Sequence, residues 1–140
     1  LVMAAAPADF RVERPSDRKI KRGEGKRAIT LVPNPDILAS ISDWPGLKIG
    51  FAAETDDLIA QAREKLARKK VDLIVANDLT KEGSGFGTDT NEVTFLFKDG
   101  RVEPRPLMPK REVAEAILDL VVEGLAARGA APAPALAARR

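Results

Sequence analysis

Lysines are the groups in this chain best able to do chemistry. The sequence has no histidine and no cysteine, which removes imidazole bases, thiol nucleophiles and the usual zinc ligands. Lys19 and Lys21 lie in the basic stretch RKIKRGEGKR, and Lys65 and Lys69 lie four residues apart in a helical pattern, where they share one face. Ammonium groups on long, flexible stems suit the binding of a polyphosphate.

Each of these features also has a purely structural explanation. A run of basic residues is usually a solvated loop, and Glu54 or Glu64 could neutralise the lysine pair. The segment NPDI, residues 34–37, is also what a capped helix start looks like, with Asn34 as N-cap. The glycine run GSGFG, residues 83–87, fits neither the Walker motif nor the dinucleotide fingerprint. No single motif is therefore diagnostic.

An α/β fold is expected to position these groups. Apolar segments over residues 1–6, 28–33, 47–52 and 71–77 predict strands, and helices are expected over residues 34–44, 56–70 and 110–127. The sequence KDG, residues 98–100, marks a hairpin between two further strands. Because strands and helices alternate and the strands are continuously apolar, we expect a mainly parallel sheet covered on both faces.

Small or polar residues follow each of the first four predicted strands. The strand ends read AAAPAD, VPNPD, GFAAET and VANDLT. In parallel sheets, ligands bind beyond the carboxyl ends of the strands, so these four ends are expected to converge on one crevice. The glycine-rich loop after Asp78 is expected to be flexible, with glycines that let the backbone approach a ligand.

Composition bounds the remaining possibilities. The 140 residues suit one domain, assigned here to residues 1–128, followed by an Ala/Pro-rich tail, 129–140, expected to be disordered. The net charge is only +2, and the basic stretch has one aromatic residue, Phe10, at its edge, so no nucleic-acid binding is expected. No apolar run approaches the roughly 20 residues that span a bilayer, so no membrane partner is expected, and the lack of cysteine fits a cytoplasmic location.

Seven sequence blocks occur in a specific order. They read AAAPADFR, KIKR, NPDIL, GFAAET, A-x-x-K-L-x-x-K, D-L-I-V-A-N-D and G-F-G-T-D-x-N, and they extend from about Val2 to Leu125. In this order the chain resembles the C-terminal half of bacterial phosphopantothenate–cysteine ligases, the synthetase part of bifunctional coenzyme A biosynthesis flavoproteins. Residues 1–128 would then be the C-terminal part of the ligase domain.

The resemblance implies a Rossmann-like three-layer α/β/α fold and a defined reaction. CTP, with Mg²⁺, would activate the carboxylate of 4'-phosphopantothenate as an acyl-cytidylate with loss of pyrophosphate, and the amine of cysteine would then displace CMP. It further implies a homodimer formed through the ligase domain. FMN would be required only if a flavin-dependent decarboxylase domain is fused upstream.

The resemblance also implies which residues form the site. Lys19 would be the catalytic flap lysine that contacts the phosphates. The nucleotide would be bound by Met3, Ala4, Ala5, Asp9, Lys19, Asn34, Pro35, Asp36, Ile37, Phe51, Lys65 and Lys69. No protein-held metal site is expected.

The chain departs from the family pattern in three respects. Pro7 stands where many members have an aliphatic residue, and Gly87 replaces a commoner asparagine. The family's phosphate-binding turn and its acyl-stabilising segment would precede Leu1, so the chain alone is expected to bind CTP weakly and to form no acyl-cytidylate. The alternative is a non-catalytic α/β nucleotide-binding or dimerisation module that uses the basic loop and the KDG hairpin.

Overall fold

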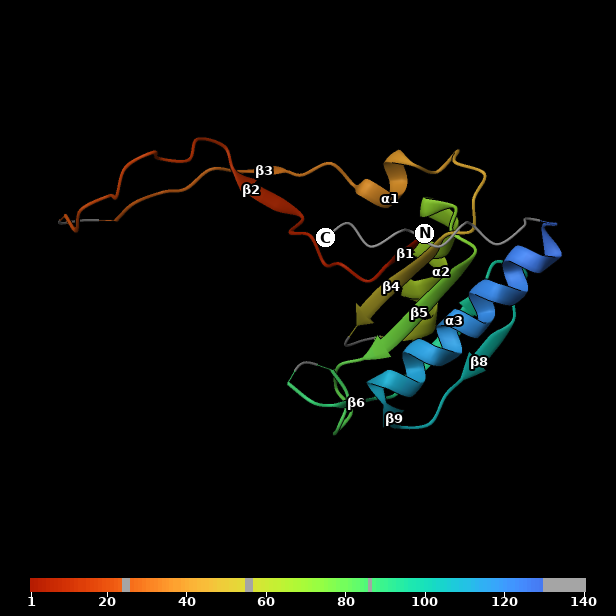
Figure 1. Cartoon of the computed structure of the whole chain (residues 1–140). Helices are drawn as coiled ribbons and strands as arrows, with labels where there is room; N and C mark the ends of the chain where they lie inside the picture. Colours follow the sequence, from red (N-terminus) through yellow and green to blue (C-terminus); the bar gives the residue numbers. More distant parts are fainter. Residues whose placement is uncertain (24–25, 55–56, 86, 130–140) are drawn as a thin grey trace, which may run out of the picture.

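Five strands form one mixed sheet in a computed structural model of the chain (Figure 1). The structure describes residues 1–23, 26–54, 57–85 and 87–129. The strand order is β1 (Val2–Met3), β4 (Ile49–Glu54), β5 (Leu73–Asp78), β7 (Val93–Phe97) and β8 (Val102–Pro104). The first three are parallel and the last two antiparallel. The expected Rossmann-like α/β fold with a C-terminal hairpin is confirmed.

Helices cover both faces of this sheet. α1 (Ile37–Ser40) and α2 (Leu58–Lys69) lie on one face, and α3 (Lys110–Ala127) lies on the other (Figure 1). Successive side chains of β5 alternate between the layers: Ile74 packs toward α2, and Val75 packs toward α3. The fully buried side chains are therefore apolar on both faces, which explains the continuous apolar run of this strand.

The two long helices follow the predicted patterns closely. The residues of α2 that pack against the sheet are Leu58, Ile59, Ala62 and Leu66, the face that helical spacing predicts. α3 begins at Lys110 and ends at Ala127, as expected, and it buries Val113 and Ile117. The hairpin between β7 and β8 turns at Gly100, whose φ of 94° favours glycine.

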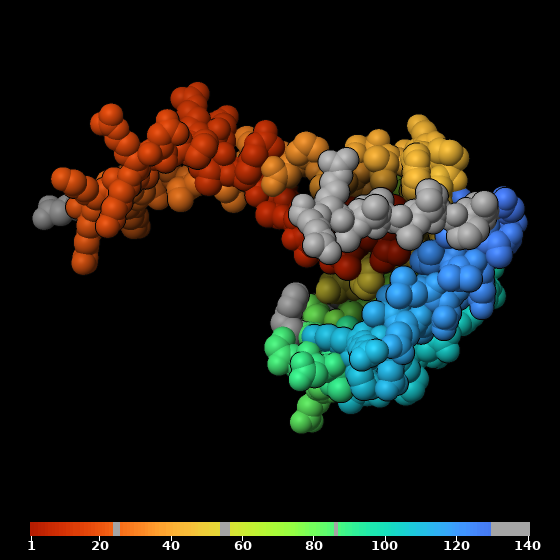
Figure 2. Space-filling view, in the orientation of Figure 1, coloured from red at the N-terminus to blue at the C-terminus, as the bar shows by residue number. Residues whose placement is uncertain are grey.

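The predicted strand over residues 28–33 does not join the main sheet. Residues Leu31–Pro33 form β3, which pairs antiparallel with β2 (Phe10–Val12) in a separate two-stranded ribbon. The ribbon and its connecting segment project from the body as an arm (Figures 1 and 2). The sequence missed this because pairing with a partner some twenty residues away leaves no local signal.

The first strand is shorter and more exposed than expected. β1 spans only Val2–Met3 rather than residues 1–6, and Val2 is 41% exposed. β1 lies at the edge of the sheet, so one of its sides has no neighbouring strand within the described residues. The prediction of a buried strand was therefore wrong at this position.

The predicted helix over residues 34–44 is also shorter. α1 has four residues, and its N-cap is Asp36, whose side chain accepts a hydrogen bond from Ala39 N at 3.1 Å. Asn34 was expected to cap this helix, but its side-chain amide donates to Ala8 O at 2.7 Å instead. The tertiary partner has displaced the local capping role.

A carboxylate at the amino-terminal end of β5 joins three elements. Asp72 Oδ2 accepts from Lys48 N at 2.9 Å, and Oδ1 accepts from Lys98 Nζ at 2.5 Å and Arg128 Nη2 at 2.7 Å. Burial raises the pKa of Asp72, but the hydrogen bonds from Lys98 and the Lys48 amide outweigh this, so the net shift is downward. This ion cluster lies at the opposite end of β5 from the polar residues Asn77 and Asp78.

A short two-stranded sheet was not anticipated from the sequence. β6 (Thr90–Asn91) pairs antiparallel with β9 (Met108–Pro109), directly before α3. This pairing brings the end of the glycine-rich loop against the start of α3. Within the described residues, no helix is long and apolar enough to cross a membrane.

Candidate functional site

A cavity of about 420 Å³ lies at the carboxyl ends of the three parallel strands. The residues that contribute to it include Met3 at the end of β1 with the following residues 4–9, residues 51–53 of β4 and Asn77 of β5. Residues 34–38 before and within α1 and Lys69 of α2 complete one side, and Gly85, Asn91 and Lys110 complete the other. Three of the four predicted strand ends thus meet through the parallel sheet, and the fourth reaches the cavity from the base of the arm.

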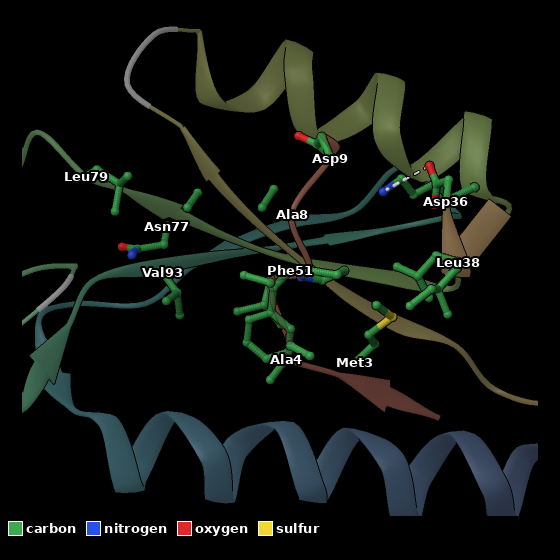
Figure 3. Close-up of a pocket in the computed structure, with 18 of the residues that line it drawn as sticks. Met3, Ala4, Ala8, Asp9, Asp36, Leu38, Phe51, Asn77, Leu79 and Val93 are labelled. Carbon is green, nitrogen blue, oxygen red and sulfur yellow. Dashed lines mark ion pairs between the residues drawn. The ribbon is translucent and has the colours of Figure 1, made fainter. Parts of the chain in front are cut away.

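Most of the predicted site residues come together in this cavity. Ten of the twelve line it, namely Met3, Ala4, Ala5, Asp9, Asn34, Pro35, Asp36, Ile37, Phe51 and Lys69. Lys19 and Lys65 do not. Figure 3 shows Asp36 and Leu38 at one end of the cavity, Asn77, Leu79 and Val93 at the other, and Phe51 between them.

Asn34 fixes the base of the arm beside the cavity. Its side-chain oxygen accepts from Arg11 Nη1 at 3.2 Å, and its side-chain nitrogen donates to Ala8 O. Its backbone N donates to Asp9 O at 2.8 Å. Asn34 therefore links residues 3–9 to residues 34–38, the two segments that lie side by side at the cavity.

Asp36 and Lys69 form an ion pair on the cavity wall, with 3.5 Å between Oδ2 and Nζ (Figure 3). The hydrogen bond from Ala39 N lowers the pKa of Asp36, and the charge of Lys69 lowers it further. Asp36 is thus ionised at neutral pH, and it holds the Lys69 ammonium at the cavity. Because the Lys69 side chain is 22% exposed, an anion entering the cavity could contact it.

Phe51 is the aromatic surface of the site. It lies on β4 with its side chain toward the cavity (Figure 3) and is 38% exposed. Phe51 is the third of the six residues of β4, a strand with neighbours on both sides, and a half-exposed phenylalanine there has little structural reason to face solvent. An aromatic face of this kind can stack on a nucleobase.

The glycine-rich loop is held by a buried hydroxyl. The Ser84 side chain lies 2.6 Å from the side-chain oxygens of both Asn77 and Asn91, and its residue is only 8% exposed. Glu92 N donates to Ser84 Oγ at 3.3 Å, and Gly85 N donates to Asn91 Oδ1 at 3.2 Å. The described residues of this loop are thus tied to β5 and β6 by hydrogen bonds.

The two residues that end β5, Asn77 and Asp78, have different roles. Asn77 lies at the cavity and contacts Ser84. Asp78 accepts from Thr80 N at 2.9 Å and Thr80 Oγ1 at 2.6 Å, which turns the chain out of the strand. The Thr80 hydroxyl and amide also lower the pKa of Asp78.

Sequence reasoning missed Asn91 and Lys110 as cavity residues. Lys110 Nζ donates to Gly85 O at 2.9 Å and to Thr88 O at 2.5 Å. Both residues reach the cavity because β6 pairs with β9. The one available signal was Lys110 at the start of a predicted helix, where a cation opposes the helix dipole and so needs another reason to be there.

Lys19 and Lys65 lie elsewhere. Lys19 is exposed on the connecting segment of the arm, outside the cavity lining. Lys65 is half-buried on α2, four residues before Lys69. Of the three lysines expected to bind the nucleotide, the structure therefore brings Lys69 to the cavity and leaves Lys19 and Lys65 outside it.

Charges of both signs line the cavity. The cations are Lys69 and Lys110, and the carboxylates are Asp9 and Asp36. Among the described residues, no cluster of three or more acidic side chains could hold a metal ion. The two ammonium groups balance the two carboxylates, and such a lining with an aromatic ring suits a ligand whose negative charge is partly offset by its own cation, as in magnesium nucleotides.

Comparison with a family model gives one extended match. Residues 1–125 match the model described as the DNA/pantothenate metabolism flavoprotein C-terminal domain. This range includes the whole cavity lining and nearly all of α3.

Two curated relatives are more than 40% identical to this chain. A protein named cysteine/cysteine sulfinic acid decarboxylase, from an unknown prokaryotic organism, is 44% identical over 120 residues, 84% of this chain and 33% of that protein. The coenzyme A biosynthesis bifunctional protein CoaBC of Bacillus subtilis (strain 168) is 43% identical over 120 residues, 84% of this chain and 30% of that protein. The chain thus spans about a third of the curated relatives it matches.

A solved structure agrees with the fold. The crystal structure of the C-terminal domain of a coenzyme A biosynthesis bifunctional protein CoaBC matches with a TM-score of 0.66 and 34% identity. The match covers 89% of this chain and 53% of that one.

Proposed function

Because the chain belongs to the DNA/pantothenate metabolism flavoprotein C-terminal domain family, we propose that it acts in coenzyme A biosynthesis as part of a phosphopantothenate–cysteine ligase. CTP would activate the carboxylate of 4'-phosphopantothenate. That carboxylate would attack the α-phosphorus of CTP, giving an acyl-cytidylate and releasing pyrophosphate. The amine of cysteine would then attack the acyl carbon, and CMP would leave as the amide forms.

One observation carries this proposal. A cavity at the carboxyl ends of parallel strands is lined by ten of the twelve residues that the ordered motifs pointed to. These residues come from four separate segments of the chain, so their convergence is a property of the fold and not of the sequence order. The names of the relatives support the pathway, and the cavity supports a nucleotide as ligand.

The chain's own residues would divide the binding work. Phe51 would offer a stacking face, and backbone amides of the segments after β1 and β3 would contact the ribose or base. Lys69 would exchange part of its pairing with Asp36 for a phosphate oxygen. Stabilising the departing pyrophosphate needs positive charge more than a proton donor, which suits a site without histidine.

Lys19 would act from the arm. In the structure it lies outside the cavity, so contact with a phosphate requires the arm to bend toward the body or to reach the cavity of a second copy. An exposed lysine on an extended segment can make either approach. Lys65 would contribute through its charge on the same helix as Lys69.

Mg²⁺ would accompany the nucleotide. It prefers octahedral oxygen ligands, mostly water and phosphate, with one or two carboxylates. Asp9 and Asp36 are the carboxylates of the cavity lining that could supply such a ligand. FMN belongs to the proposal only through a decarboxylase domain fused upstream, and no residue of this chain is assigned to it.

A homodimer formed through this domain is part of the proposal. The arm supports it because its apolar side chains are exposed: Phe10 is 57% exposed, Leu31 56% and Ile29 68%. Isolated exposed apolar residues are ordinary, but several on one thin ribbon suggest a covered surface. Light scattering on the wild type and on Leu31→Glu would test this. We expect a dimer that the variant dissociates, and a monomeric wild type would contradict it.

The nucleotide proposal is tested by melting temperature. At a CTP concentration about 100 times its Kd, binding adds about 2.7 kcal/mol of stability, and each kcal/mol shifts the melting temperature by about 2 to 4 °C in a chain of this size. We expect a larger shift with CTP and Mg²⁺ than with ATP and Mg²⁺. A folded protein that responds to neither nucleotide would count against the proposal.

A further inference from the structure

Lys110 bridges two carbonyls of the glycine-rich loop. Its ammonium donates to Gly85 O at 2.9 Å and to Thr88 O at 2.5 Å, and its backbone N donates to Asp89 O at 2.9 Å. Lys110 is the first residue of α3 and also lines the cavity. One side chain thus joins the start of a long, packed helix to a loop on the cavity wall.

The loop needs such a tie because it has no regular structure of its own. Gly83 and Gly85 have φ angles of 77° and 99°, a region that glycine enters easily and that confers little rigidity. Carbonyls pointing toward one point repel each other through their dipoles. An ammonium between them removes that repulsion, and hydrogen bonds to charged donors are stronger than neutral ones.

The other side of the loop is already fixed. Ser84 contacts Asn77 and Asn91, and Gly85 N donates to Asn91 Oδ1. Those bonds hold the amide side of Gly85, whereas Lys110 holds its carbonyl. With both held, the backbone of Gly85 presents a fixed surface to the cavity.

We propose that Lys110 is a positioning residue that fixes the glycine-rich loop as one wall of the ligand cavity, opposite Asp36 and Lys69. Its contribution to binding comes through the loop, because a wall already in place spares the ligand the entropic cost of ordering it. This inference rests on the proposed function only where it concerns CTP.

The test compares Lys110→Met with Arg111→Met. Methionine keeps the unbranched stem and the helix propensity of lysine but removes all the donors. Arg111 is the next residue of α3, and it pairs with Glu115 on the exposed side of the helix. Both variants remove one positive charge from the same turn, so a general charge effect cancels between them.

The first readout is hydrogen exchange of the ligand-free protein, followed by NMR. For Lys110→Met we expect the amides of Gly85 and Glu92 to exchange about tenfold faster or more, as the loss of two charge-assisted hydrogen bonds implies. The amides of β5 should be unchanged. Arg111→Met should match the wild type throughout, and Lys110→Arg should lie between the wild type and Lys110→Met.

The second readout is CTP affinity by calorimetry, for which we expect about a 3- to 30-fold loss in Lys110→Met and no loss in Arg111→Met. Weaker affinity with unchanged exchange would mean that Lys110 touches the ligand, which overturns a positioning role. Faster exchange with unchanged affinity would overturn the link to the cavity. If the wild type does not bind CTP, the proposed function fails, while the exchange comparison still decides whether Lys110 fixes the loop.

Discussion

Replacing Lys69 by methionine should weaken nucleotide binding without unfolding the protein. Of the lysines expected to bind the nucleotide, Lys69 is the one that lines the cavity, and it pairs with Asp36 at 3.5 Å. A hydrogen bond from an ammonium to a charged acceptor contributes about 1.5–3 kcal/mol. A part-exposed ion pair contributes about 0–1 kcal/mol.

The two values give the expected size of the effect. When a phosphate replaces Asp36 as the partner of Lys69, the hydrogen bond to the phosphate is gained and part of the ion pair with Asp36 is lost. The net contribution of Lys69 to binding is therefore about 1–2.5 kcal/mol. This corresponds to about a 5- to 70-fold rise in the Kd for CTP in Lys69→Met. The free energy of unfolding should change by less than about 1 kcal/mol, because only the ion pair with Asp36 is lost.

Arg68→Met is the matched control. Arg68 precedes Lys69 in the same turn of α2 and pairs with Glu64 at 3.5 Å on the exposed side of the helix. The variant loses the same charge but no cavity contact, so its Kd should rise less than about threefold. Calorimetry with CTP and Mg²⁺ at about 0.1 M salt measures both, and urea denaturation gives their stability. Equal losses of affinity in the two variants would refute the assignment of Lys69 to a phosphate.

Three further outcomes follow from the structure. Asp72→Asn should lower the free energy of unfolding by about 2–4 kcal/mol, because the Asp72 carboxylate is only 12% exposed and accepts three hydrogen bonds. As a control, Asp99→Asn at an exposed position should lower the free energy of unfolding, measured by urea denaturation, by less than about 1 kcal/mol. Folding lowers the pKa of Asp72, so the contribution of its ionised form to stability should be complete above about pH 4 and disappear as the pH falls through the folded pKa. The difference in unfolding free energy between wild type and Asp72→Asn should therefore narrow in acid. Gly85→Ala and Gly87→Ala should each lower the free energy of unfolding by about 1 kcal/mol, because both positions have positive φ. Gly85→Ala should cost more and also weaken CTP binding, because a Cβ there would lie 3.1 Å from the Leu79 side chain, whereas a Cβ at Gly87 would have no heavy atom within 4 Å.

The central elements could be predicted because their signals are local. The helix Lys110–Ala127 and the apolar face of α2 follow from residues three and four apart, and these positions interact directly along a helix. The KDG hairpin follows from a turn that needs glycine at Gly100. The apolar run of β5 indicated burial on both faces, which in turn indicated a layered α/β fold with its site at the strand ends.

The same reasoning failed where one residue had two possible partners. Asn34 is a good N-cap for the helix after it, yet its side chain bonds to Ala8 and Arg11. The segment Leu31–Pro33 has the pattern of a sheet strand, yet it pairs with β2 in the arm. In both cases a distant partner competed successfully with the local one, and the sequence alone contains no measure of that competition.

By itself, then, the sequence determined the layered α/β fold and the order of the motifs that resemble the family, because short-range periodicity and turn chemistry depend on neighbours along the chain. Through that resemblance it also indicated ten of the residues that line the cavity. Only the tertiary structure decided that Lys69 and not Lys65 faces the cavity, that Lys19 lies away from it on the arm, and that Lys110 holds the loop at Gly85. These outcomes depend on the pairing of β6 with β9 and on which face of α2 packs against the sheet. Contacts such as the β6–β9 pairing join residues well separated along the chain, and their free energies are fixed by packing and not by local preference.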